Sequence, residues 1–61
     1  MNATNGAVVK SLVAVKAQAR KYSDYYNTFW YVRLMDNGSY QTWAHSAGEI
    51  VAEFYCGKAV K

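Results

Sequence analysis

Apolar side chains recur at alternating intervals of four and three residues in the first part of the chain. The recurring positions are Val8, Leu12, Val15, Ala19, Tyr22 and Tyr26. Because an α-helix turns once in about 3.6 residues, this spacing puts all of them on one side of a helix. It predicts a helix over residues 7–26, capped by Thr4 or Asn5, with residues 1–6 as a flexible N-terminus.

The segments FWYVRLMD and SYQTWAHS flank the dipeptide Asn37-Gly38. Asn-Gly favours a two-residue type I′ turn, because both central positions of that turn need positive φ. We therefore expect a β-hairpin over residues 28–45 with its turn at 37–38. In that register Val32 faces Trp43, and Met35 faces Tyr40.

Neither face of the expected hairpin is polar. Successive side chains of a strand point to opposite faces, so the register divides them into two sets. One face carries Trp30, Val32, Leu34, Gln41, Trp43 and His45, and the other carries Phe29, Tyr31, Arg33, Met35, Tyr40, Thr42 and Ala44. The first set can pack against helices. The second set is left as an apolar outer face.

A capping-box sequence, S-x-x-E at residues 46–49, precedes a second apolar stripe and predicts a helix over residues 47–56. Gly57 suits the left-handed position that ends a helix. For residues 57–61, a tail and a short edge strand both remain open. The sequence thus predicts one small α+β domain, residues 1–61, of α-β-β-α order, in which two helices pack on an antiparallel hairpin.

The chain is so short that we expect a second molecule to contribute to its stability. A domain of 61 residues buries only about 60% of the surface of its unfolded chain, so its stability is marginal. Cys56 is the only cysteine, which excludes a disulfide within the chain. His45 and Cys56 are too few soft ligands for a four-ligand metal site. We therefore expect a homodimer that extends or covers the sheet, or a partner that covers its outer face.

The positive charge is concentrated in the first helix. The net charge is +3, and residues 1–27 carry four basic side chains against Asp24 alone. The four are Lys10, Lys16, Arg20 and Lys21. Lysines and arginines that pair with phosphates, beside rings that stack on bases, are typical of DNA- and RNA-binding proteins. Four such charges are also what an ordinary solvated helix face carries, and no helix-turn-helix spacing or RNP-type sheet signature accompanies them.

No residue pattern indicates catalysis or a cofactor. A nucleophile–base pair of Cys56 and His45 would need a third group to orient the imidazole, and the predicted second helix puts the thiol near two glutamates, where it is less acidic. No apolar run approaches the roughly 20 residues of a membrane-spanning helix, and no secretory signal is visible. We expect an intracellular, cytoplasmic, non-enzymatic protein that uses no cofactor, no metal and no membrane.

Two functions remain as expectations. The first is an interaction protein that binds and modulates, and more specifically inhibits, a larger macromolecular partner through Phe29, Tyr31, Arg33, Met35 and Tyr40, since rings, Met and Arg are enriched in interfaces. By analogy of size alone, accessory proteins of viruses and mobile elements belong to this class. The second is a small nucleic-acid-binding protein that uses the helix cations for phosphates and Tyr31, Arg33 and Tyr40 for stacking.

Overall fold

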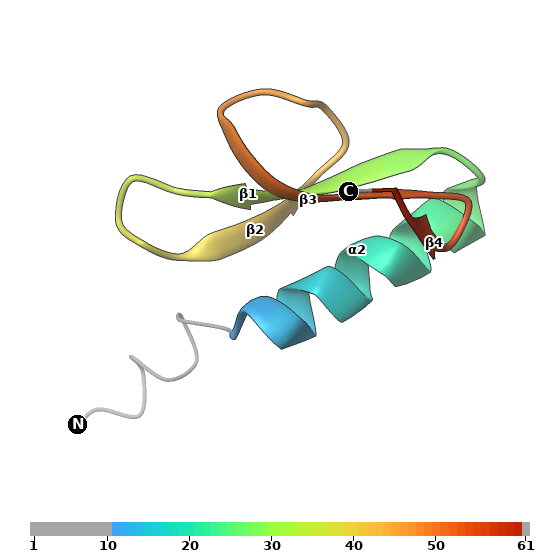
Figure 1. Ribbon diagram of the computed structural model, residues 1–61, viewed down its shortest axis with the longest axis horizontal. Helices are drawn as coiled ribbons and strands as arrows, with labels where there is room; N and C mark the ends of the chain where they lie inside the picture. Colours follow the sequence, from blue (N-terminus) through green and yellow to red (C-terminus); the bar gives the residue numbers. More distant parts are fainter. Residues whose placement is uncertain (1–10, 61) are drawn as a thin grey trace.

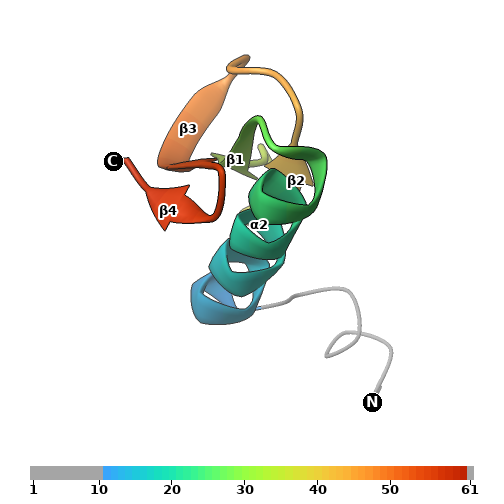
Figure 2. The same ribbon diagram turned by 90° about the vertical axis from the view of Figure 1, so that its right-hand side faces the viewer.

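The computed structural model describes residues 11–60, which form one helix and one four-stranded antiparallel sheet. The elements are α2 (Leu12–Tyr26), β1 (Phe29–Leu34), β2 (Tyr40–Trp43), β3 (Glu49–Tyr55) and β4 (Lys58–Ala59). The strand order is β2-β1-β3-β4, and α2 lies against one face of the sheet (Figures 1 and 2). The α+β class is therefore as predicted, whereas the second helix and the α-β-β-α order are not found among the described residues.

Helix α2 has a cap at each end. Its N-cap is Ser11, whose hydroxyl accepts a hydrogen bond from the Ala14 N–H at 3.2 Å. The predicted caps, Thr4 and Asn5, and the predicted first turns at 7–10 lie outside the described residues. The helix ends at Tyr26 because Asn27 adopts the left-handed conformation (φ 59°), which asparagine tolerates better than most residues.

Small side chains hold the helix close to the sheet. Val15 and Ala19 of α2 pack on Val32, Ala52 and Phe54, and none of the five is more than 4% exposed. Leu12, Trp30 and Tyr40 pack around this cluster. The core is small, so most of the ring surface of the chain lies at its margin or outside it.

The register of the first hairpin differs from the prediction by one residue. The turn is centred on Asp36-Asn37, because the Gly38 N–H donates to the Met35 carbonyl and the Met35 N–H donates to the Ser39 carbonyl. Gly38, with φ 87°, is the left-handed residue of a G1 bulge. The predicted type I′ turn at 37–38 is therefore wrong.

This shift moves the whole second strand to the opposite face. Trp43 pairs with Tyr31 and Tyr40 pairs with Leu34, whereas the predicted partners were Val32 and Met35. Because side chains alternate along a strand, a slip of one residue exchanges the two faces of β2. Tyr40 therefore packs toward the core cluster, and Trp43 faces away from the helix.

The helix predicted over 47–56 is wrong: residues 49–55 of this segment form the strand β3, which pairs with the second edge of β1. Its apolar residues fit a helical stripe and a strand equally, but Ile50, Val51 and Phe54 are β-branched or aromatic types that suit a pleated surface. Pairing with β1 also satisfies backbone groups that a two-stranded hairpin would leave open. A bulge at Val51 shifts the register between the two halves of the pairing.

The tight turn after β3 links the sheet to the helix. Cys56 (φ 52°) and Gly57 (φ 84°) are the two central residues of a turn that leads into the short edge strand β4. Positive φ at both positions is the type I′ geometry. The buried Ser23 hydroxyl accepts a hydrogen bond from the Gly57 N–H at 2.9 Å and donates one to the Arg20 carbonyl at 2.8 Å.

We expect Ser23→Ala to destabilise the fold by about 1–3 kcal/mol, because it leaves the Gly57 N–H without its partner beside the helix. The measurement is the free energy of unfolding from urea denaturation. Ser11→Ala is the matched control and removes one exposed cap hydrogen bond, at a cost of about 1 kcal/mol. If the two variants lose the same free energy of unfolding, the hydrogen bond between Ser23 and Gly57 stabilises the fold no more than an exposed helix cap does.

Candidate functional site

The face of the sheet that points away from α2 is rich in rings. It carries the odd-numbered residues of β1 and the residues that pair with them in β2 and β3. These residues are Phe29, Tyr31, Arg33, Gln41, Trp43, Ile50, Glu53 and Tyr55. No second helix covers this face in the described part of the chain. We call it the outer face.

Three rings at one end of the outer face form a cluster, which we call the outer cluster. The Phe29 and Tyr55 ring centroids lie 4.4 Å apart, and the Phe29 and Tyr31 rings lie 6.2 Å apart and nearly parallel, at 9°. Phe29 is 39% exposed and Tyr55 is 44% exposed. The rings hold one another in place and still present apolar surface to water.

The other end of the outer face is partly covered by the connection between β2 and β3. Both strands run antiparallel to β1 and lie on its two sides, so residues 44–48 must cross β1, and they do so on the side opposite α2 (Figure 1). Arg33 lies under this connection, with its guanidinium carbon 5.0 Å from the centre of the Trp43 ring. A Cβ at Gly48 would collide with the Arg33 Nε.

One nitrogen of each residue in this cation–π pair is withdrawn from solvent. Arg33 Nε and Trp43 Nε1 are buried and have no hydrogen-bond partner among residues 11–60. Arg33 is therefore fixed by packing on a ring and under Gly48. It orders one end of the outer face.

A second group of rings, the helix-end cluster, lies on the helix side of the start of β1. It consists of Tyr22, Tyr25, Tyr26 and Trp30, with ring centroids between 4.9 and 6.4 Å apart in the contacting pairs. Tyr25 is 79% exposed and Tyr26 is 58% exposed. Rings thus flank both sides of β1 at the same end of the strand.

The structure places three of the five predicted partner-binding residues together. Phe29, Tyr31 and Arg33 share the outer face. Tyr40 does not, because the register shift turns it toward the helix, and its assignment to the outer face is wrong. Met35 lies in the turn after β1.

Sequence reasoning missed two rings of the outer face, Trp43 and Tyr55, and with them Gln41, Ile50 and Glu53. Trp43 was assigned to the wrong face by the assumed type I′ turn. Tyr55 falls within the helix predicted over residues 47–56, whereas it ends a strand and pairs with Phe29. The density of β-branched and aromatic residues over 50–55 was the one signal that could have identified this strand.

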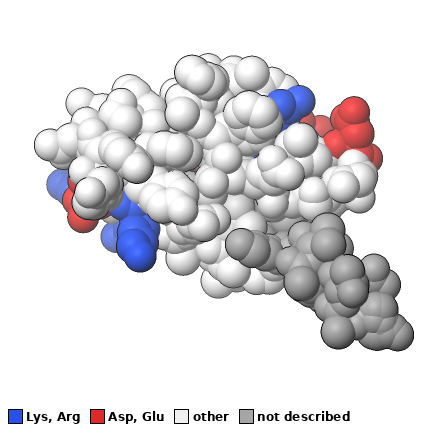
Figure 3. All heavy atoms as spheres, turned by 180° about the vertical axis from the view of Figure 1, so that it is seen from behind, with Lys and Arg blue, Asp and Glu red and all other residues white. Residues whose placement is uncertain are grey.

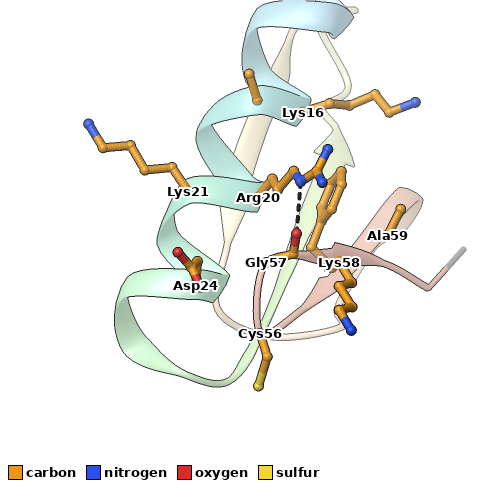
Figure 4. A pocket seen from close by; sticks show the side chains of 10 residues that line it. Lys16, Arg20, Lys21, Asp24, Cys56, Gly57, Lys58 and Ala59 are labelled. Atoms are coloured by element: carbon orange, nitrogen blue, oxygen red, sulfur yellow. Dashed lines mark hydrogen bonds between the residues drawn. The ribbon is translucent and has the colours of Figure 1, made fainter.

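The basic side chains of α2 do not form one track. Lys10 lies outside the described residues. Figure 4 shows Lys16 and Arg20 on the side of the helix that faces β4, and Lys21 pointing away from it. Arg20 Nε donates to the Gly57 carbonyl at 2.7 Å, so this guanidinium is partly engaged within the fold.

An open groove of about 760 Å³ separates the helix from the last hairpin. It is lined by Lys16, Ala17, Arg20, Lys21, Asp24, Phe54, Cys56, Gly57, Lys58 and Ala59. Four cations, Lys16, Arg20, Lys21 and Lys58, line the groove, and Asp24 is the acidic residue of the lining (Figure 4). The groove is basic, and it opens beside β4 rather than on the outer face.

Three further features bear on chemistry and location. No three His, Cys, Asp or Glu side chains within residues 11–60 group together as metal ligands. His45 is exposed in the connection after β2, and Cys56 is half-buried in the turn after β3. The helix that the structure describes is too short and too polar to span a membrane.

Comparisons with known proteins give no relative. No family model, no curated protein and no solved structure matches the chain. Arguments about function therefore rest on the surfaces described above.

Gly48→Ala is expected to destabilise the fold by about 2–3 kcal/mol, because it adds a clash with Arg33 to the strain of positive φ. Gly38→Ala is the matched control: its φ is also positive, but a Cβ there meets no atom within 4 Å, so we expect about 1 kcal/mol. Urea denaturation of both variants gives the comparison. If both variants lose the same free energy of unfolding, the new Cβ at residue 48 causes no lasting clash, because the Arg33 side chain moves aside.

Proposed function

We propose that the chain is a non-enzymatic interaction protein that binds a larger protein through its outer face and inhibits it by covering a functional surface. The observation that carries the proposal is the exposed outer cluster on a sheet face that the helix does not cover. Large rings anchor protein interfaces because they bury much apolar area with few rotatable bonds.

The composition of the outer face resembles the centre of a protein interface. Rings, an arginine, an isoleucine and a glutamine dominate, and Glu53 is the single acidic member. Aromatic residues and arginine are enriched at such centres, whereas lysine and most acidic residues are depleted. The nearly parallel rings of Phe29 and Tyr31 are held before binding, which lowers the entropy cost of association.

The charges favour a protein over nucleic acid as the occupant of this face. Glu53 pairs directly with Tyr31, so a carboxylate stands beside the rings on which bases would stack. Arg33, the cation of the face, is packed on Trp43 with its Nε buried. The cations of α2 and β4 line the groove beside β4 instead. Phosphates and stacked bases would therefore need two separate surfaces.

The double variant Phe29→Ala, Tyr55→Ala is expected to raise the Kd for the partner at least tenfold, because each ring is an exposed anchor whose loss costs about 1–2 kcal/mol. The partner is first identified by affinity purification from the native host with nuclease present. Titration calorimetry with the purified partner then gives Kd, and an assay of that partner's activity tests inhibition.

Tyr25→Ala is the matched control for that experiment, since it removes a more exposed ring from the helix-end cluster. We expect its Kd to stay close to that of the unchanged protein. If the double variant binds as tightly as the unchanged protein while both keep the same circular dichroism, the outer face is not the binding surface.

The nucleic-acid hypothesis has its own test. Binding to duplex DNA through phosphates loses affinity linearly in log Kd against log salt, with a slope of about 0.9 per contact. Lys16→Gln with Lys58→Gln removes two cations that line the groove, and Lys21→Gln removes a third lining cation, whose side chain points away from β4. A steep salt slope that falls clearly more in the double variant than in Lys21→Gln would support nucleic-acid binding at the groove. A shallow slope shared by all the variants would reject it.

A further inference from the structure

The two free edges of the sheet differ in how they are protected. The edge strand β4 has only two residues, one of which is Lys58, and Arg20 binds the turn before it. Shortness and lysine are features that prevent an edge from pairing with another strand. The other edge, β2, has the sequence Tyr-Gln-Thr-Trp, with no charge, proline or bulge within the strand. It is the unprotected edge of the described sheet.

The surroundings of β2 are also poor in charge. Figure 3 views the molecule from the side on which β2 lies in Figure 2, and coloured charged side chains of the described residues gather toward the two ends of that view. Between β2 and α2 lies a small polar groove. It is lined by Val15, Gln18, Asn37, Ser39, Tyr40, Gln41 and Thr42, none of them charged. An uncharged surface cannot repel its own copy.

The hydrogen-bond pattern fixes which backbone groups are free. Met35 N–H donates to the Ser39 carbonyl, and in an antiparallel pair every second residue bonds to the neighbouring strand. Gln41 and Trp43 therefore bond to β1, whereas the N–H and C=O of Tyr40 and Thr42 point out from the edge. No turn or loop backbone group within residues 11–60 bonds to these four groups.

We infer that β2 of one chain pairs antiparallel with β2 of a second copy, about a two-fold axis at Gln41. Tyr40 of each copy then exchanges two backbone hydrogen bonds with Thr42 of the other, which satisfies all the free groups of both edges. The two Gln41 side chains face each other across the axis on the outer face, where their amides can bond to one another. Two four-stranded sheets become one continuous sheet.

Gln41 provides the test, because its side chain is exposed and lies on the axis. Gln41→Lys sets two like charges directly opposite each other, and so does Gln41→Glu. We expect each variant alone to raise the dimer dissociation constant at least about fivefold, and an equal mixture of the two to restore it. Sedimentation equilibrium measures the constants, and circular dichroism checks that each variant is folded.

Ala47→Lys is the matched control. It adds the same charge at an exposed position of the β2–β3 connection, away from the axis, and should leave the dissociation constant unchanged. A protein that stays monomeric at all concentrations overturns the inference. So does a dimer that is unaffected by Gln41→Lys, since that dimer uses another surface.

Amide hydrogen exchange gives a second reading that needs no variant. As the concentration rises through the dissociation constant, the Tyr40 and Thr42 amides should become protected by at least about tenfold. The Gln41 and Trp43 amides already bond to β1 and should show no such dependence. Exchange at Tyr40 and Thr42 that stays fast in a proven dimer would place the contact elsewhere.

Pairing at this edge leaves the outer cluster free. If the β2 pairing is disproved, the proposed function of the outer face is therefore not affected.

Discussion

The close contact between α2 and the centre of the sheet determines the rest of the structure. Ala19 of the helix and Ala52 of β3 are completely buried, and their small side chains allow the helix backbone to lie close to the strands. One helix of this length can cover only one face of the sheet. Every ring that does not reach the margin of this contact must therefore remain on the outer face or at an end of the molecule.

This constraint explains why so aromatic a chain keeps its rings in clusters. Among residues 11–60, Phe54 is the one ring buried in the core, with 4% of its surface exposed. Trp30 and Tyr40 pack at the edge of the core, and the helix-end and outer clusters take most of the remainder. Contact between exposed rings removes part of their surface from water, which offsets some of the cost of leaving them outside.

The sequence predicted the helix and the two faces of β1 because both depend on local periodicity. Val15 and Ala19 lie in the buried stripe of α2, and Val32 lies under it. The register of β2 could not be read in this way. Asn-Gly suits both a type I′ turn and a type I turn with a G1 bulge, and the two differ by one residue in pairing. That single residue exchanged Tyr40 and Trp43 between the core and the outer face.

The strand β3 was missed for a different reason. Over residues 47–56 the apolar spacing fits a helix, and the preceding S-x-x-E sequence looks like a cap. What decides the outcome is non-local: the second edge of β1 needs a partner, and Ala52 with Phe54 fill the space below α2. Periodicity within ten residues contains no information about an edge formed by residues twenty positions away. The same error hid Tyr55, the ring that contacts Phe29 most closely in the outer cluster.

The inferred pairing at β2 and the proposed use of the outer face are geometrically compatible. A two-fold axis between antiparallel edge strands runs perpendicular to the sheet, so both helices lie on one side of the joined sheet and both outer clusters lie on the other. Two copies would then present two equivalent ring clusters in the same direction. A partner with two matching sites would bind such a dimer more tightly than a single chain, since the second contact is intramolecular. In this arrangement the unprotected edge and the uncovered face, each unfavourable for an isolated chain, contribute to a single binding surface.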